Sequence, residues 1–324
     1  MLRHATVILD CDPGHDDAVA ILLALAQTEW RIDAITVVAG NQTLPKTTRN
    51  ALTVLTVAGR TDVPVYAGCD RPLERELHTA ANVHGESGLE GPTDLPEPAV
   101  MAKPEHSVDF LIRYLDEATE PVTLIPTGPL TNVSSVLLRR PDLSGKLERI
   151  VLMGGAVGEG NTTPSAEFNV YTDPEAARVV FRCGAPVTMI GLDVTHQALV
   201  PEREFEIIRS WGGPVCEMVA DLLVYFARFH RRLCGFDGVP IHDACAVAVA
   251  LRPELATTRR LHVDVETTGE LTTGRTVVDL WGVTGNPPNA DVAVDIDRDG
   301  FFALLYEGLR SYAPGGANDP GRRD

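Results

Sequence analysis

The chain has 324 residues, of which 44% are hydrophobic, and carries a formal net charge of −17 at pH 7. This length and composition fit one large α/β domain or two small ones with a sizeable core. The acidic balance argues against a nucleic-acid partner, because such a partner needs a basic face and no lysine-arginine run provides one. No apolar run reaches the length of a membrane span, so no membrane partner is expected.

The cysteines at positions 11, 69, 183, 216, 234 and 245 form no CxxC pair and no zinc-type grouping with histidine. We therefore expect reduced thiols in a core. The first residues, "MLRHATVILD", run directly into a strand-like pattern without the features of a signal peptide. Together these observations predict a cytoplasmic protein.

Short β-branched runs alternate with helical patterns over the first two hundred residues. Strands are predicted at 5–10, 32–40, 63–68, 121–128, 149–155 and 186–193, and helices at 15–28, 47–59, 107–118, 130–140 and 174–184. A loop rich in glycine and proline is expected from about Asp70 to Pro104, and another before Tyr171. This alternation predicts an α/β fold with an open, mostly parallel, Rossmann-like sheet flanked by helices.

After residue 200 the pattern becomes mainly helical, which predicts a helical insertion. A proline-led segment at 201–211 precedes a helix from about Val215 to Leu233, and "HDACAVAVALRPEL" begins another. Residues 261–296 predict two or three strands that pair antiparallel. We expect a single domain over residues 1–313 and a disordered tail at 314–324, which is rich in glycine, proline and charged residues.

The strongest local signal is "ILDCDPGHDDAVAILLAL", residues 8–25. It places Asp10, Asp12, Asp16 and Asp17 within eight residues, between apolar flanks. Buried carboxylates this close repel one another, so a folded chain keeps them charged only with a cation among them. Helix capping explains one or two of these aspartates, not four. An oxygen-rich cluster suits the hard cations Ca²⁺ and Mg²⁺.

Polar residues also follow other predicted strands, namely Asn41, Thr127 and the 154–170 loop. Ligands of open α/β sheets bind at the carboxyl ends of the strands. These residues should therefore meet the aspartates in one cleft.

Three further patterns are weak when taken alone. They are "HDACAVA" with His242 and Asp243, "AEFNVYTDP" with Glu167 and Asn169, and "NVHGESG" with His84. From the local sequence, helix capping by Asp243 and ordinary interior or exposed histidines explain them better than a site does.

Taken in order, six blocks resemble the inosine-uridine preferring nucleoside hydrolases: "DCDPGHDDAVAILLA", "GNQTLPKTTRNA", "PTGPLTN", "VLMGGAVGEGN", "AEFNVYTDPEAA" and "HDACAVA". The resemblance runs from about Ala5 to Tyr312. It implies a Ca²⁺ ion at the carboxyl edge of the sheet and cleavage of the N-glycosidic bond of ribonucleosides into free base and ribose. We also expect a homodimer or a homotetramer.

The resemblance further implies that Asp12, Asp17 and Asp243 ligate the metal by carboxylate and Thr127 by its backbone carbonyl. Asp10 would brace this cluster from behind. Asp12 would also serve as general base for the attacking water, and His242 would assist the departing base. The residues expected to bind substrate are Asp16, Asn41, His84, Met153, Asn161, Glu167, Asn169 and His230.

The sequence departs from the family pattern near the base. Many members place a tyrosine or glutamine there, whereas the nearest candidates here are Tyr225, His230 and Cys234, so the group that activates the leaving base stays open. Purine-specific relatives have a tryptophan beside the base, and the loop at 82–84 has none. This difference favours a pyrimidine or inosine-uridine preference.

Two alternative functions remain at this point. A Mg²⁺-dependent phosphohydrolase is suggested by "DCD", but that class expects a threonine or serine soon after the second aspartate, and here Pro-Gly-His follows. A non-catalytic ribose-binding module would not need Asp12 to activate water.

Overall fold

The computed structural model describes residues 5–322 and is built on a nine-stranded sheet, with the strand order β10-β9-β11-β6-β5-β4-β1-β2-β3. The strands of this sheet are β1 (Ala5–Cys11), β2 (Trp30–Val37), β3 (Val65–Ala67), β4 (Val122–Pro126), β5 (Leu147–Met153), β6 (Val187–Ile190), β9 (Ala256–Val265), β10 (Thr276–Asp279) and β11 (Ala290–Ile296). A separate two-stranded sheet pairs β7 (Leu199–Pro201) with β8 (Gly238–Pro240).

The strands from β3 to β6 are all parallel to their neighbours, and β11 joins β6 in the same direction. The predicted open, mostly parallel sheet is therefore confirmed. The prediction of antiparallel pairing after residue 261 is correct for β9 with β10 and with β11, but it misses the parallel pairing of β11 with β6. That pairing extends the sheet beyond β6, and of its nine strands only β9 runs against the others.

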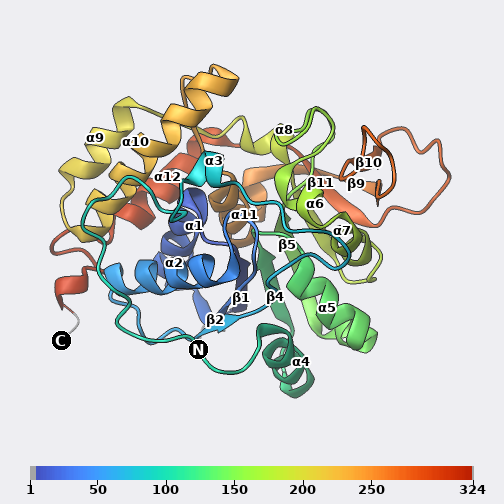
Figure 1. Ribbon diagram of the computed structural model, residues 1–324, viewed down its shortest axis with the longest axis horizontal. Coiled ribbons are helices and arrows are strands. Elements are labelled where there is room, and N and C mark those ends of the chain that lie inside the picture. The colour runs from blue at the N-terminus through green and yellow to red at the C-terminus, as the bar shows by residue number, and fades with distance from the viewer. Residues whose placement is uncertain (1–4, 323–324) are drawn as a thin grey trace.

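Helices cover both faces of the sheet (Figure 1). On one face lie α1 (His15–Ala26), α2 (Leu44–Val57), α9 (Arg203–Ser210), α10 (Pro214–Cys234), α11 (His242–Leu251) and α12 (Arg298–Arg310). The other face carries α4 (Ser107–Glu117), α5 (Thr131–Arg139) and α7 (Pro174–Phe181). Three short helices lie in connections at the carboxyl edge, namely α3 (Ala81–His84), α6 (Phe168–Thr172) and α8 (Leu192–Thr195).

Two helices, α1 and α11, are almost wholly buried and pack against each other. Both are apolar around most of their circumference, as expected for helices enclosed on every side. α1 directly follows β1, and α11 lies beside it over β5. The first turns of the two helices therefore meet at the carboxyl edge of the sheet, and these turns carry Asp16, Asp17 and Asp243.

The long connection between β3 and α4 crosses the carboxyl edge and carries α3. It is tied to the helices below it by Asp173, which accepts hydrogen bonds from Leu73 N (2.9 Å) and Thr131 Oγ1 (2.6 Å). Arg75 adds a bidentate ion pair, in which its Nε and Nη2 atoms donate to the carboxylate of Glu175 at 2.8 and 2.7 Å. This connection, residues 68–106, is therefore fixed to the helices below it, and we call it the strap.

The end of the chain differs from the predicted disorder. Residues 314–322 form turns and a short 3₁₀ helix, Pro320–Arg322. The side chain of Asn318 is 9% exposed and donates to Ser311 Oγ (2.9 Å) and Ala26 O (3.4 Å), which holds this segment against the ends of α12 and α1. Positions 323 and 324 of the predicted tail lie outside the described residues. Within residues 5–322, no helix combines the length and the apolar character needed to cross a membrane.

Candidate active site

Asp12 follows the end of β1 and is fully buried. Its Oδ2 accepts a hydrogen bond from the backbone N–H of Asn41 at 2.7 Å, whereas its Oδ1 has no partner among the described residues. Gly40 and Gly128 make room for this carboxylate. A Cβ atom on Gly128 would lie 2.5 Å from Oδ1, and one on Gly40 would lie even closer to Oδ2.

Carboxylate oxygens of Asp16, Asp17 and Asp243 come within 4.8 Å of one another, and all three side chains are buried. Asp17 is held by hydrogen bonds from Gly14 N and Asn41 Nδ2, both at 3.0 Å, and from Thr127 Oγ1 at 2.9 Å. The positive ends of two helix dipoles favour negative charge at this point. Asn41 and Thr127 therefore meet Asp17 at one edge of the sheet, as predicted.

The carboxylates of this cluster destabilise one another when they lack a counter-charge. Burial, followed by the neighbouring charges, raises the pKa of Asp16 to about 8 and holds the pKa values of Asp12 and Asp243 well above their usual range. Burial also raises the pKa of Asp10 to about 6, although Thr36 and Asn132 donate hydrogen bonds to it at 2.6 and 2.8 Å. A bound cation would reverse these shifts.

The donor set fits a hard divalent cation. All the candidate ligands are oxygens, and the Oδ1 of Asp12 is an acceptor without a partner within residues 5–322. The three carboxylates that converge most tightly include Asp16, which was predicted to bind substrate, and leave out Asp12. Asp10 accepts its hydrogen bonds from Thr36 and Asn132, which lie outside the cluster, and its predicted bracing role stays a prediction.

A second group of predicted residues reaches the cluster from α6. Glu167 caps this helix, and its carboxylate accepts hydrogen bonds from Asn169 N (2.8 Å), Gly155 N (2.8 Å) and Val170 N (3.1 Å). Burial raises the pKa of Glu167 to about 7. Asn169 donates through Nδ2 to the carbonyl oxygens of Thr127 (2.7 Å) and Met153 (3.1 Å), which joins α6 to the ends of β4 and β5.

Asn161 differs from the other predicted residues because it is exposed. Its Oδ1 accepts a hydrogen bond from Phe168 N at 2.9 Å, and it makes no hydrogen bond to the cluster among the described residues. Its predicted contact with ribose stays a prediction.

Buried histidines and aromatic rings form the other wall of the site. The Nδ1 atoms of His84 and His15 lie 2.9 Å apart, and the ring of His15 stacks on Tyr225 and Phe226 with centroids 5.3 and 5.1 Å away. His230 donates through Nδ1 to Phe226 O at 3.1 Å, and its ring centroid lies 6.3 Å from that of His242.

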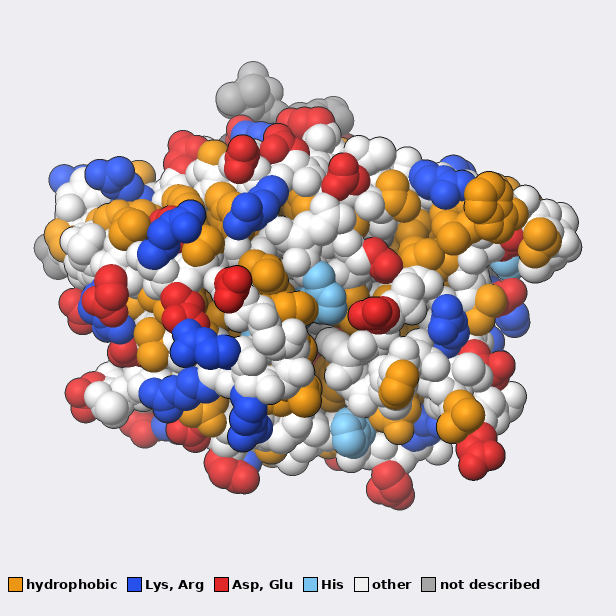
Figure 2. Space-filling model, turned by 90° about the horizontal axis from the view of Figure 1, so that it is seen from above, with side chains coloured by type: hydrophobic (Ala, Val, Ile, Leu, Met, Phe, Trp, Pro, Cys, Tyr) orange, Lys and Arg blue, Asp and Glu red, His pale blue; other side chains and the backbone are white. Residues whose placement is uncertain are grey.

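These imidazoles are held in the neutral form. Burial lowers the pKa of His15 and His230 to about 4 and that of His84 and His242 well below the usual range. The site thus combines a carboxylate cluster on one side with neutral imidazoles and aromatic rings on the other. Figure 2 looks onto this edge of the sheet, where a histidine side chain lies near the centre of the face with acidic side chains on both sides.

A profile of the inosine-uridine preferring nucleoside hydrolases matches residues 7–303. The chain belongs to this family. It is 54% identical over 308 residues to the pyrimidine-specific ribonucleoside hydrolase RihA of Escherichia coli O139:H28, a match that covers 95% of this chain and 99% of that protein. The predicted family and enzyme class, a hydrolase acting on N-glycosyl compounds, are therefore confirmed.

Solved structures of nucleoside hydrolases have the same fold. A purine-preferring ribonucleoside hydrolase from Gardnerella vaginalis superposes with a TM-score of 0.89 at 33% identity, covering 94% of this chain and 98% of its own. A plant nucleoside hydrolase superposes with a TM-score of 0.90 at 33% identity, covering 95% and 99%.

Sequence reasoning missed two residues of this nucleoside hydrolase site. His15 stands inside the aspartate motif, and its place directly before Asp16 at the start of a helix could have revealed it. Thr195, whose hydroxyl lies 2.7 Å from His242 Nδ1, follows a strand end as the other site residues do. Of the residues considered near the base, Tyr225 stacks on His15, whereas Cys234 is exposed.

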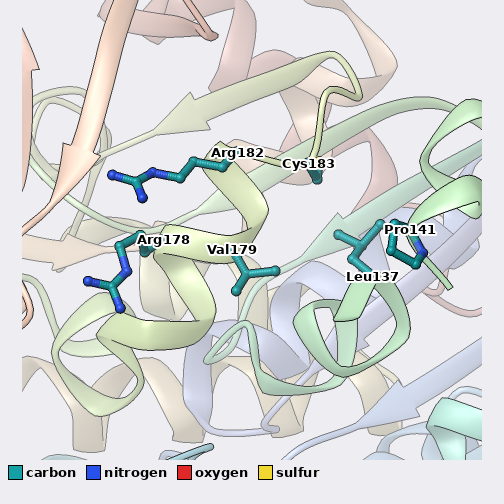
Figure 3. A pocket seen from close by; sticks show the side chains of 6 residues that line it. All are labelled: Leu137, Pro141, Arg178, Val179, Arg182 and Cys183. Atoms are coloured by element: carbon teal, nitrogen blue, oxygen red, sulfur yellow. The ribbon is translucent and has the colours of Figure 1, made fainter. Parts of the chain in front are cut away.

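A separate groove of about 300 Å³ lies between the final turns of α5 and α7 (Figure 3). It is lined by Leu137, Pro141, Arg178, Val179, Arg182 and Cys183. The two guanidinium groups bond to Thr267 and Asp264, both at 2.8 Å, and point away from Leu137. None of these lining residues belongs to the aspartate cluster or to the histidine wall. This groove is therefore not part of the nucleoside hydrolase site.

Proposed function

We propose that this nucleoside hydrolase cleaves the N-glycosidic bond of pyrimidine ribonucleosides in preference to purine ones, releasing free base and ribose. The buried carboxylate cluster facing neutral histidines at the carboxyl edge of the sheet carries this proposal. The pyrimidine preference is supported by the 54% identity to a pyrimidine-specific enzyme and by the absence of tryptophan from residues 68–106, the strap over the site.

We infer that the cation is Ca²⁺, held by the carboxylates of Asp12, Asp17 and Asp243 and by the backbone carbonyl of Thr127. The all-oxygen donors and the unpartnered Oδ1 of Asp12 support this assignment. When bound, the ion supplies positive charge that attracts the ribose hydroxyls and lowers the pKa of nearby water.

Breaking the bond to the base builds positive charge on the ribose ring, as in other glycoside hydrolysis. The buried carboxylates are fixed before the substrate arrives, so they stabilise this charge without reorganising. Asp12 would also act as general base for the attacking water, because its buried carboxylate receives only the hydrogen bond from Asn41 N–H within residues 5–322. Asp16, Asn41, Met153, Asn161, Glu167 and Asn169 would hold the sugar.

The departing base carries negative charge that a hydrogen-bond donor stabilises. His242 would donate this hydrogen bond as a neutral imidazole, because burial keeps its pKa well below neutrality. His84 and His230, which lie in the same wall, would contact the base and set its orientation.

The assembly and location of the enzyme belong to the same proposal. We infer a homodimer or homotetramer, supported by exposed apolar side chains at the end of the molecule that carries the edge strand β10, where Leu271, Trp281 and Val283 are each more than 80% exposed (Figure 2). Light scattering on the purified protein tests this inference.

The six free cysteines support a reducing compartment, the cytoplasm, and the net charge of −17 supports the absence of a nucleic-acid partner.

A hydrolysis screen with uridine, cytidine, inosine and adenosine tests the function. We expect free base and ribose from uridine and cytidine at the highest rates. If all four nucleosides stay intact with Ca²⁺ present, the proposal is wrong, and hydrolysis of a phosphate ester instead would favour the phosphohydrolase alternative. Tight uridine binding without turnover would favour a ribose-binding module.

A further inference from the structure

The hydroxyl of Thr195 lies 2.7 Å from Nδ1 of His242. Thr195 ends the short helix α8, which follows β6 at the carboxyl edge, whereas His242 is the first residue of α11. The threonine is fully buried and the histidine is 7% exposed. Two separate elements therefore present these side chains to each other inside the protein.

The direction of this hydrogen bond follows from counting hydrogens. A neutral imidazole carries one N–H, and a hydroxyl can either donate or accept. If Nδ1–H donated to Thr195, the threonine hydrogen would be buried without an acceptor, because Oγ1 has no other partner among residues 5–322. If the hydroxyl donates to Nδ1, no buried hydrogen is left unpaired, and the N–H of the ring is then on Nε2.

Within the described part of the chain the Nε2 atom of His242 has no hydrogen-bond partner. The rings of His196 and His230 lie near the His242 ring, with centroids 5.6 and 6.3 Å away. The next residue, Asp243, belongs to the carboxylate cluster. An N–H on Nε2 is thus available to a ligand held beside that cluster.

We propose that Thr195 is a positioning residue whose hydroxyl donates to Nδ1 of His242 and so holds the Nε2–H tautomer, which donates a hydrogen bond to the leaving base. This inference rests on the proposed nucleoside hydrolysis for its catalytic consequence. The tautomer itself is independent of that function and can be measured without substrate.

The first test reads the tautomer directly. In the full-length protein with ¹⁵N-labelled histidine, long-range ¹H–¹⁵N spectra distinguish a protonated Nδ1 from a protonated Nε2, and His242→Gln assigns the signals. We expect Nε2–H in the wild type and in Thr195→Ser, and loss of this single tautomer in Thr195→Val. Thr123→Val is the matched control, because it removes another buried hydroxyl. Thr123 lies in β4, and its hydroxyl donates to Glu148 at 3.2 Å. Nδ1–H in the wild type, or an unchanged tautomer in Thr195→Val, overturns the proposal.

The second test compares leaving groups. For Thr195→Val we expect the kcat for uridine to fall roughly 10- to 100-fold, with a much smaller change for p-nitrophenyl riboside, whose leaving group needs no hydrogen-bond donor. Thr195→Ser should restore uridine turnover. Equal losses on both substrates would overturn the positioning role even with an altered tautomer. If the wild type hydrolyses neither substrate, the proposed function fails, and the spectra still decide the tautomer.

Discussion

The position of the Asp12 carboxylate depends on two neighbouring glycines, which have no side chain, as much as on the hydrogen bond that it receives. The carboxylate fits between Gly40 and Gly128, and within the described chain it receives one hydrogen bond, on Oδ2, while Oδ1 has no partner. A buried carboxylate in this state is costly unless a ligand completes it. Asp12 therefore lowers the stability of the metal-free protein, and its carboxylate remains available to a ligand.

Replacing Gly128 by alanine should remove activity by displacing this carboxylate. The added Cβ would lie 2.5 Å from Asp12 Oδ1, and we expect kcat for uridine to fall roughly 10²-fold or more, since displacements of about 1 Å in an active site have effects of this size. Gly145→Ala is the matched control, because an added Cβ there meets nothing within 4 Å. Equal activity of the two variants in a steady-state assay would show that Asp12 tolerates displacement.

Asp12→Asn keeps the shape of the side chain but removes its basicity. We expect turnover to fall by roughly 10³-fold or more, while the circular dichroism spectrum stays that of the wild type because the amide still fills the same space. Near-normal turnover in this variant would exclude Asp12 as the general base.

At the scale of elements, His15 joins parts of the chain that are distant in sequence. It opens α1, its ring touches His84 of α3 and stacks on Tyr225 and Phe226 of α10, and its Nε2 donates to Glu90 O at 2.8 Å. The helix that carries Asp16 and Asp17 thereby also fixes the histidine wall. The side chain of His15 therefore links the position of the carboxylate cluster to that of the histidine wall.

His15→Ala should loosen the base side while sparing the carboxylate cluster. We expect kcat/KM for uridine to fall roughly 10- to 100-fold through the misplaced ring of His84, with little change in the amount of Ca²⁺ bound at saturation. His262→Ala, at a histidine on β9 that bonds to Pro287 O and Asp264, should behave as the wild type. A His15→Ala enzyme with unchanged kcat/KM would reduce His15 to a packing residue.

At the scale of the whole molecule, the site makes stability depend on pH and on metal. The pKa values of Asp10 and Asp16 are raised from 3.8 to about 6 and about 8, so the stability they contribute to the metal-free protein is complete below about pH 4 and is lost as the pH rises through these values. The lowered pKa values of His15 and His230 act in the opposite direction, but only as the pH falls below 6.5.

Between pH 6.5 and 8 the carboxylates therefore dominate. We expect the melting temperature of the chelator-treated protein to fall across this window, and the increase in melting temperature caused by Ca²⁺ to grow, because the cation binds the deprotonated cluster. Chelation should also abolish hydrolysis. Differential scanning calorimetry at three pH values in this window, with and without Ca²⁺, measures the effect. A Ca²⁺-induced shift that shrinks as the pH rises would contradict the assignment of the cluster as the metal site.

The sequence alone determined the alternation of strands and helices, the parallel sheet and the aspartate motif, because hydrophobic periodicity and charge repulsion act over short stretches of chain. It also placed Asn41 and Thr127 at the same edge, since parallel strands bring their carboxyl ends together. Tertiary structure decided the rest. His15 meets His84, and Thr195 meets His242, across gaps of 69 and 47 residues, and no local pattern encodes such pairings. The segment 314–322 is a similar case, because its composition resembles that of a disordered segment, whereas its position depends on contacts such as those of Asn318 with Ala26 and Ser311.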